Sequence, residues 1–330
     1  MASITILDGG FSTQLATHVG VKIDGDPLWT ARFLETHPKS VLDTHLDFLR
    51  AGAFIIETNS YQASIEGFIE HLGITESESL QLIHKSVELA KEAVNVYLEE
   101  IKDNNDVSNN KPLIAGSCGP YGASLHDGSE YTGEYASTVS KEFLKKWHKP
   151  RIEALINSGV DLLALETIPC KIEAEALVEL LKEYPNIEAW LTFSCRTDGK
   201  CIVDGSDFRK IALECYENAI PGQLIAVGVN CIAPTAVSSL FQGINSDREK
   251  ELVPLIVYPN SGEIYTVAEG WKKCGKVPPL ENFIHEWLDL GVRYVGGCCR
   301  TQASDITKIS IEALKWEKKN FEKIFSENSD

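Results

Sequence analysis

Short apolar segments alternate with longer amphipathic segments along all 330 residues, and this alternation constrains the fold more than any other feature of the chain. The apolar segments are rich in residues that favour strands, and several begin just after a glycine at which a preceding helix should stop. They predict eight strands, over residues 4–7, 54–58, 113–117, 162–167, 189–194, 225–230, 255–258 and 294–298.

The amphipathic segments place their apolar residues at helical spacing. They predict helices over residues 38–51, 76–101, 138–157, 172–184, 207–219, 234–243, 280–290 and 303–316. Pro150 should kink or break the third of these. A strand followed by a helix, repeated eight times, indicates an α/β protein with parallel strands, and we expect a single-domain (βα)8 TIM barrel. A doubly wound open sheet is the alternative.

The predicted barrel domain spans residues 1–330, because a barrel of this kind needs ~250 residues. A polar loop at 103–110 precedes the third strand and should lie on the bottom face of the barrel. The loop at 260–279 follows the seventh strand and so lies on the top face, where it is a candidate lid. Residues 317–330 form a charged tail that we expect to be frayed.

The charge balance narrows the classes of partner. Lysine and arginine number 31 and aspartate and glutamate 48, a formal net charge of −17, which argues against binding to nucleic acid or to anionic membranes. Residues 1–8 lack the basic and long apolar segments of a signal peptide, and no apolar stretch of ~18 residues occurs. Nine cysteines, an odd number, fit a reducing compartment. We therefore expect a cytoplasmic protein that binds small molecules.

Three cysteines stand at the ends of two predicted strands. Cys231 ends the sixth strand, and Cys298 and Cys299 end the eighth. Adjacent cysteines are poor disulfide partners, but a closed barrel would bring these two strand ends together and allow the three thiols to bind one metal ion. The alternative is that they are buried apolar residues, because cysteine is among the residues most often found inside proteins.

Three thiolates favour zinc, which prefers tetrahedral sulfur and nitrogen ligands. Such a site carries a formal charge of +2 − 3 = −1 and leaves one position open. It is a weak Lewis acid but a suitable anchor for a further thiolate, and a thiol that binds there loses its proton. The cysteines therefore predict a site for alkyl transfer to a substrate thiol, with no catalytic side chain beyond the activated thiolate.

Two carboxylates also stand at strand ends. Asp8 precedes two glycines, which let the backbone approach a ligand, and Glu166 ends a fully apolar segment where an unpaired charge is costly. The ammonium group of an amino acid would pair with either carboxylate. The alternatives are a helix N-cap or turn role for Asp8 and a salt bridge to a neighbouring lysine or arginine for Glu166.

These strand ends belong to nine motifs that follow one another between residues 4 and 316. They are Asp8-Gly9-Gly10, Asp26-Pro27-Leu28-Trp29, Glu57-Thr58-Asn59-Ser60-Tyr61, Gly116-Ser117-Cys118-Gly119-Pro120-Tyr121-Gly122-Ala123, Asp127-Gly128-Ser129-Glu130-Tyr131, Leu165-Glu166-Thr167-Ile168-Pro169, Gly228-Val229-Asn230-Cys231, Tyr258-Pro259-Asn260-Ser261-Gly262-Glu263 and Gly296-Gly297-Cys298-Cys299-Arg300-Thr301. Together they resemble the homocysteine S-methyltransferase family.

The resemblance implies one zinc ion per chain on a (βα)8 barrel, with homocysteine sulfur as the fourth ligand. The implied metal ligands are Cys231, Cys298 and Cys299. The implied residues for the amino and carboxylate ends of homocysteine are Asp8, Gly9, Thr58 and Glu166. Trp29 matches an aromatic residue that faces the methyl donor in the betaine-using branch, where an indole face favours a cation; an ordinary core tryptophan is the alternative.

The branches of the family differ in their methyl donor. Members that use methylfolate carry extra folate and cobalamin domains, for which 330 residues leave no room. Betaine-using members are longer and have a tyrosine where this chain has Gln62. The chain most resembles the short members, for which we expect a monomer that transfers a methyl group from S-methylmethionine, or more weakly S-adenosylmethionine, to the thiolate of L-homocysteine to give methionine.

Several alternatives remain open. A betaine-dependent or other thiol or selenol methyltransferase would share the fold, and a non-catalytic zinc-binding or thiol redox-sensing protein would use the same cysteines. A barrel zinc hydrolase is disfavoured because no His-x-His pair follows a strand. Of the histidines, only His126 should reach a substrate. The six other cysteines have no predicted partner: Cys118, Cys170, Cys195, Cys201, Cys215 and Cys274.

Overall fold

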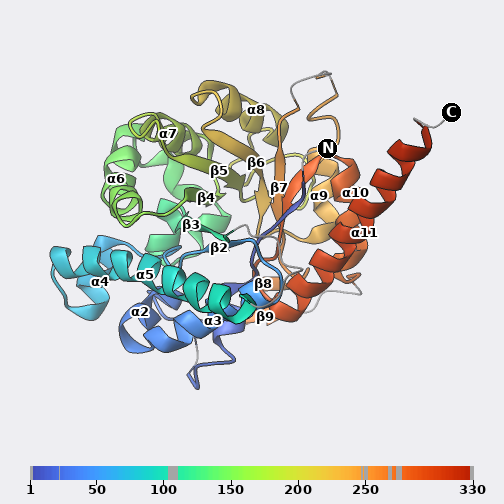
Figure 1. Cartoon of the computed structure of the whole chain (residues 1–330). Helices are drawn as coiled ribbons and strands as arrows, with labels where there is room; N and C mark the ends of the chain where they lie inside the picture. Colours follow the sequence, from blue (N-terminus) through green and yellow to red (C-terminus); the bar gives the residue numbers. More distant parts are fainter. Residues whose placement is uncertain are drawn as a thin grey trace.

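A single eight-stranded parallel sheet forms the centre of the molecule (Figure 1). The computed structural model of the chain describes residues 3–21, 23–102, 111–246, 248, 252–266, 270–272 and 277–327. The barrel strands are β1 (Thr5–Ile6), β2 (Ile55–Glu57), β3 (Leu113–Cys118), β4 (Leu162–Ile168), β5 (Glu188–Phe193), β6 (Leu224–Asn230), β7 (Leu255–Tyr258) and β10 (Val292–Val295).

The sheet closes on itself. The strand order is β1-β10-β7-β6-β5-β4-β3-β2, and a parallel bridge between Leu7 and Ile55 joins β1 to β2. Two backbone hydrogen bonds support this seam, from Phe54 to Ile6 at 2.8 Å and from Asp8 to Ile55 at 3.1 Å. The predicted (βα)8 barrel is therefore confirmed, and the open doubly wound sheet is wrong.

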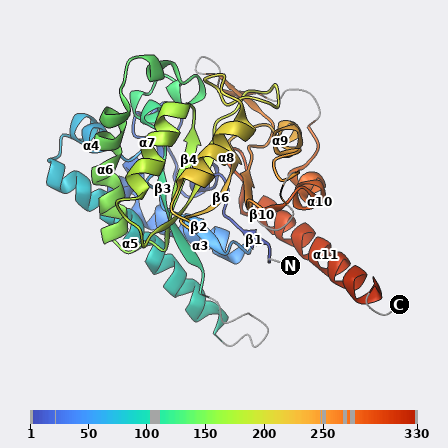
Figure 2. The same ribbon diagram turned by 90° about the horizontal axis from the view of Figure 1, so that it is seen from above.

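Helices surround the barrel and cover its outer face (Figures 1 and 2). They are α1 (Phe11–Leu15), α2 (Phe33–Thr36), α3 (Pro38–Arg50), α4 (Ile65–Leu72), α5 (Glu76–Ile101), α6 (Lys141–Asn157), α7 (Lys171–Leu181), α8 (Phe208–Asn218), α9 (Pro234–Phe241), α10 (Ile284–Asp289) and α11 (Ala303–Glu327). None of these described helices is long and apolar enough to cross a bilayer.

Inside the barrel, side chains from the strands fill the space below the top face. The buried members of this cluster are Leu7, Ile55, Ala115, Leu162, Ala164, Trp190, Ala226, Ile256 and Tyr258. Trp190 donates its indole N–H to the hydroxyl of Tyr258 at 3.0 Å, and the Thr192 hydroxyl lies 2.8 Å from the same oxygen. Because Tyr258 also lines the cavity above, this bonded group forms the boundary between the packed interior and the site.

Two predicted boundaries are wrong, and a break at Pro150 is not observed. The last barrel strand ends at Val295, so Gly296 to Cys299 form a loop and not a strand end. Pro150 does not break α6, which is continuous; the carbonyl that loses its partner belongs to exposed Lys146, where water can replace the missing N–H. Helix α11 continues past Trp316 to Glu327, because residues 304–327 contain no glycine or proline to end it.

The two predicted insertions are only partly described. Residues 103–110 lie outside the described residues. Within 260–279, strands β8 (Ile264–Thr266) and β9 (Gly270–Lys272) form an antiparallel hairpin that the periodicity did not predict. Residues 267–269 and 273–276 of this loop lie outside the described residues, so its role as a lid stays a prediction. Of the tail at 317–330, residues 328–330 likewise lie outside them.

A buried polar network anchors the long connection between β3 and α6. Glu173, in the first turn of α7, accepts the backbone N–H of Tyr121 at 2.6 Å and lies 2.7 Å from Nε2 of His148. The hydroxyl of Tyr135 donates to its other oxygen. Glu173 thus holds both the start and the end of this connection, which contains the short 3₁₀ helices η2 (Tyr121–Leu125), η3 (Ser129–Tyr131) and η4 (Glu134–Ser137).

Arg151 extends the same network from α6. Its guanidinium donates to the Gly119 carbonyl and lies 2.9 Å from Nδ1 of His148. Burial and the neighbouring guanidinium lower the pKa of His148 to about 4, so the ring is neutral at pH 7. With Nδ1 accepting from Arg151, the proton is assigned to Nε2, which donates to Glu173. The neutral ring therefore links a buried cation to a buried carboxylate.

We predict that Glu173→Gln lowers the free energy of unfolding by about 3–5 kcal/mol. The substitution removes the buried carboxylate and leaves the buried charge of Arg151 without compensation. Urea denaturation measures this change. Glu175→Gln is the matched control: it lies on the same helix but pairs with lysines at the surface, and its effect should stay within about 0.5 kcal/mol. Equal effects of the two substitutions would contradict a structural role for the network.

Candidate active site

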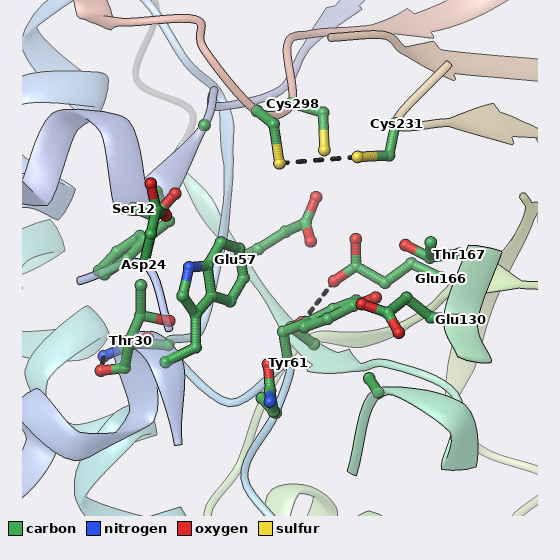
Figure 3. Close-up of a pocket in the computed structure, with 18 of the residues that line it drawn as sticks. Ser12, Asp24, Thr30, Glu57, Tyr61, Glu130, Glu166, Thr167, Cys231 and Cys298 are labelled. Carbon is green, nitrogen blue, oxygen red and sulfur yellow. Dashed lines mark hydrogen bonds between the residues drawn. The ribbon is translucent and has the colours of Figure 1, made fainter. Parts of the chain in front are cut away.

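A cavity of about 460 Å³ opens at the carboxyl-terminal end of the barrel, where the sequence predicted the site. Its walls come from the ends of β1, β2, β3, β4, β6 and β7, the start of α1, the connection between α1 and α2, the loop after β10 and the connection that follows β3. Figure 3 shows cysteine sulfurs on one side of this space and carboxylates facing them. Parallel strands direct their carboxyl ends to one edge, so closure of the barrel is what assembles these groups.

The three predicted metal ligands meet in this cavity. The sulfur atoms of Cys231, Cys298 and Cys299 all lie within 4.8 Å of one another, and those of Cys231 and Cys299 are 3.6 Å apart. A tetrahedral zinc ion with bonds of about 2.3 Å would separate two sulfur ligands by about 3.8 Å. The donor set and its spacing therefore fit a thiophilic metal ion.

Backbone geometry aims these cysteines. Cys231 directly follows β6 and has a φ of 51°, which is uncommon outside glycine, and its N–H donates to the Tyr258 carbonyl at 3.0 Å. On the other side, a Cβ at Gly10 would lie 2.4 Å from the Cys298 carbonyl oxygen, and one at Gly296 would lie 2.6 Å from the Asp8 carbonyl oxygen. Glycine at both positions lets the loop after β10 press against the end of β1.

The thiols differ from one another electrostatically. Hydrogen bonds from Cys298 and Cys299 lower the pKa of Cys231 well below that of an ordinary thiol. Tyr131 adds a further contact, with its hydroxyl oxygen 3.5 Å from the Cys231 sulfur. The same contacts with Cys231 raise the pKa of the Cys298 and Cys299 thiols.

Three carboxylates face the cysteines from the ends of β1, β2 and β4. Asp8 accepts the backbone N–H of Glu57 at 2.8 Å, and Ser117 donates its hydroxyl to Glu166. Burial raises the pKa of all three carboxyl groups, most strongly those of Asp8 and Glu57, and the charge of Glu166 raises both further. The group therefore favours protons or a bound cation, which suits a substrate ammonium group.

The alternatives for Asp8 and Glu166 are not observed. Helix α1 is capped by Gly10 without a side-chain hydrogen bond, so Asp8 does not cap it. Among the described residues, Glu166 forms no salt bridge with lysine or arginine; it accepts from Ser117 and lies 3.5 Å from the Asn230 amide nitrogen. Both carboxylates are instead directed to the cavity, which they line.

The remaining residues implied by the resemblance also line the cavity. Thr58 is buried and accepts the Ser117 N–H at 3.0 Å, while Gly9 lies at the end of β1. Trp29 is half-buried, with its indole 5.8 Å from the Tyr61 ring in an edge-to-face arrangement. It is therefore a cavity residue that also packs on the core, and its contact with a donor stays a prediction.

Asn230 orients the end of β4. Its side-chain oxygen accepts the Thr167 N–H and the Thr192 hydroxyl, each at 2.8 Å, and its amide nitrogen donates to the Thr167 hydroxyl at 2.8 Å. Thr167 has a φ of 59°, a strained conformation for a β-branched residue. Asn230 holds this conformation and with it the direction of the neighbouring Glu166.

Sequence reasoning missed several residues of the site. Glu57 was available as a strand-end carboxylate beside Thr58, but Glu130 and Tyr131 lie in a connection whose path no periodicity predicts. His126 does line the cavity, as expected, and its Nδ1 is 2.9 Å from the Gln62 amide nitrogen. The described cysteines outside the cluster are all free: Cys118, Cys170, Cys195, Cys201 and Cys215. Cys274 lies outside the described residues.

Known proteins share this architecture and these motifs. A family model described as Homocysteine S-methyltransferase matches residues 5–313. A betaine-homocysteine S-methyltransferase of Drosophila melanogaster is 47% identical over 93% of this chain and 93% of its own length. Homocysteine S-methyltransferase 1 of Arabidopsis thaliana is 44% identical, with 92% of each chain covered. The crystal structure of the homocysteine methyltransferase MmuM from Escherichia coli, metallated form, has a TM-score of 0.80 and 38% identity, covering 94% of this chain and 96% of that one.

We predict that Asn230→Ala lowers the free energy of unfolding by about 2–4 kcal/mol, because it leaves the Thr167 N–H buried without an acceptor and removes the support of a strained residue. Chemical denaturation of the purified protein tests this expectation. Asn218→Ala, at an exposed position on α8, should change stability by less than about 0.5 kcal/mol. An Asn230 variant as stable as the wild type would show that Thr167 holds its conformation without this support.

Proposed function

This chain belongs to the homocysteine S-methyltransferase family, and on that premise we propose that it transfers a methyl group from a sulfonium donor, S-methylmethionine or more weakly S-adenosylmethionine, to the thiolate of L-homocysteine. The observation that carries the proposal is the meeting of three cysteine sulfurs and three carboxylates in one cavity. Thiols suit a sulfur substrate held at a metal ion, and carboxylates suit its ammonium group.

We assign one zinc ion per chain to Cys231, Cys298 and Cys299, whose sulfur donors and spacing fit it. Bound there, zinc would hold the homocysteine sulfur in its thiolate form at neutral pH, where a free thiol with a pKa of about 8.5 is mostly protonated. Three cysteines leave one position of a tetrahedral site for that sulfur.

The remaining cavity residues bind the amino-acid part of homocysteine. Asp8 and Glu166 are buried carboxylates without a described cationic partner, and an ammonium group would supply the missing charge. Gly9 and Thr58 complete the contacts that we assign to homocysteine. Two fixed ends, the sulfur at the cysteines and the ammonium at the carboxylates, would hold the nucleophile in one orientation.

The chemical step needs no proton from the protein. The homocysteine thiolate forms a bond to the methyl carbon as the bond from that carbon to the donor's sulfonium sulfur breaks. The departing sulfur keeps the bonding electron pair and leaves as a neutral thioether, so no general acid is required. The residues of the chain therefore act by binding and orienting two substrates and by excluding water from the cavity.

A betaine donor is the second candidate, because the Drosophila relative carries a betaine-homocysteine name. Trp29 would offer an indole face to either a quaternary ammonium or a sulfonium. The acidic lining of the cavity favours the sulfonium amino acid, which carries one more positive charge than zwitterionic betaine. A non-catalytic metal-binding or redox role of the cysteines is a further outcome of the tests below. Selenol methylation is the remaining alternative.

We propose that the protein is cytoplasmic and monomeric and that it acts on small molecules. The net charge of −17 disfavours nucleic-acid and anionic membrane surfaces as partners. The described cysteines are all free, as in a reducing compartment.

Methionine formation from homocysteine, measured with S-methylmethionine, S-adenosylmethionine, betaine and methyltetrahydrofolate in parallel, tests the choice of donor. We expect the highest kcat/KM with S-methylmethionine, a lower value with S-adenosylmethionine and no turnover with methyltetrahydrofolate. A kcat/KM for betaine equal to that for S-methylmethionine would move the chain to the betaine-using branch.

We predict that Cys298→Ala reduces bound zinc well below one equivalent per chain and abolishes methyl transfer, while the barrel stays folded. Metal analysis, the methionine assay and circular dichroism provide the three measurements. Cys201→Ala is the matched control, because Cys201 is equally half-buried but lies outside the cluster, and it should keep both zinc and activity. Full activity of the Cys298 variant would refute the metal assignment. Metal binding without methyl transfer in the wild type would favour a sensing role.

A further inference from the structure

One carboxylate oxygen in the cavity has no hydrogen-bond partner among the described residues. Glu130 lies on η3, in the connection between β3 and α6, and lines the cavity. Its Oε2 atom is buried and accepts no hydrogen bond among the described residues. Figure 3 shows this side chain on the side of the cavity formed by Tyr61, Thr167 and Glu166. A buried anionic oxygen without a donor is costly, so a donor is missing from the described site.

Among the described residues, no cation fills this gap. Six carboxylates line the cavity: Asp8, Asp24, Asp26, Glu57, Glu130 and Glu166. No lysine or arginine is among the described residues of its wall. Arg32 pairs with one of these six carboxylates, that of Asp26. Burial raises the pKa of Glu130 to about 7, which is the behaviour of a carboxylate held without a counter-charge. The missing donor should therefore come from a cationic ligand.

The position of Glu130 separates it from the carboxylates that we assign to homocysteine. Asp8, Glu57 and Glu166 stand at the ends of strands β1, β2 and β4, and their charges act on one another. Glu130 instead lies on a connection above the strand ends, next to cavity residues His126 and Gly128. Homocysteine must bring its sulfur down to the cysteine cluster, so the second substrate has to occupy the space nearer to this connection.

Resting on the proposed function, we propose that Glu130 recognises the α-ammonium group of the methyl donor and so selects amino-acid sulfonium donors over cations that lack N–H groups. An ammonium offers the charged hydrogen-bond donor that Oε2 lacks. A quaternary ammonium such as betaine, or a sulfonium without an amino group, offers charge but no N–H. Glu130 is thus a specificity-determining residue.

The connection that carries Glu130 is held firmly enough for this role. Glu173 binds the backbone at Tyr121 before it and the hydroxyl of Tyr135 after it. The adjacent Tyr131 places its hydroxyl 3.5 Å from the Cys231 sulfur, which ties the same short helix to the cysteine cluster. A carboxylate held at a fixed place in the cavity can set the distance between the donor's ammonium group and its methyl group.

The test compares Glu130→Gln with the wild-type holoenzyme on two donors, S-methylmethionine and dimethylsulfoniopropionate, a sulfonium carboxylate without the amino group. We expect kcat/KM for S-methylmethionine to fall about 10- to 100-fold, as for loss of a charged hydrogen bond. The value for dimethylsulfoniopropionate should change less than about twofold, and the KM for homocysteine should stay constant. If the amino-free donor is not turned over, its inhibition constant against S-methylmethionine replaces kcat/KM.

Glu134→Gln provides the control, because Glu134 lies in the same connection but is exposed and does not line the cavity; its kinetics should match the wild type. Equal losses on both donors would overturn the proposal and leave Glu130 a general support of the site. An increase confined to the KM for homocysteine would show that Glu130 binds the methyl acceptor, and this result would also overturn the proposal. Absence of transfer from S-methylmethionine in the wild type is a separate result, which refutes the proposed donor itself.

Discussion

The concentration of acidic groups at one end of the barrel is the constraint on which the rest of the site depends. Three thiols and six carboxylates share one cavity without a described lysine or arginine in its wall. Such a set is stable only when protons, a metal ion or cationic ligands neutralise it. Burial, together with the charge of Glu166, raises the pKa of Asp8 and Glu57. The same buried acidic groups therefore attract substrates that carry ammonium and sulfonium groups.

Holding these groups in place requires rigid support, because like charges would otherwise separate. Asn230 forms hydrogen bonds with the strained Thr167 and with Thr192, and so fixes the direction of the end of β4. Glycines at positions 10 and 296 bring the ends of β1 and β10 into backbone contact. These supporting contacts lie at the strand ends. Beneath the site, the backbone hydrogen bonds of the barrel already fix the strands.

The strand ends and the connection after β3 therefore carry different parts of the site. The strand ends carry the cysteines and the carboxylates proposed to bind the acceptor, and their positions follow from the barrel. The connection after β3 carries Glu130 and Tyr131, and its position depends on the buried Glu173 network outside the barrel. A change in this connection need not move the cysteine cluster, so the donor selection proposed for Glu130 would be separable from metal binding.

The amino-acid sequence by itself determined the eight-fold alternation, hence the barrel, and with it the convergence of Cys231 with Cys298 and Cys299. Hydrophobic period is a local property, and in a closed parallel barrel it tells which residues lie at or just beyond the carboxyl ends of the strands, although the last strand ends at Val295 and not at Cys298 as predicted. Only the tertiary structure decided that Pro150 is tolerated, that Glu57 joins Asp8 and Glu166, and that Oε2 of Glu130 has no hydrogen-bond partner among the described residues. Those outcomes depend on burial and on contacts between residues far apart in the chain, which no local pattern records.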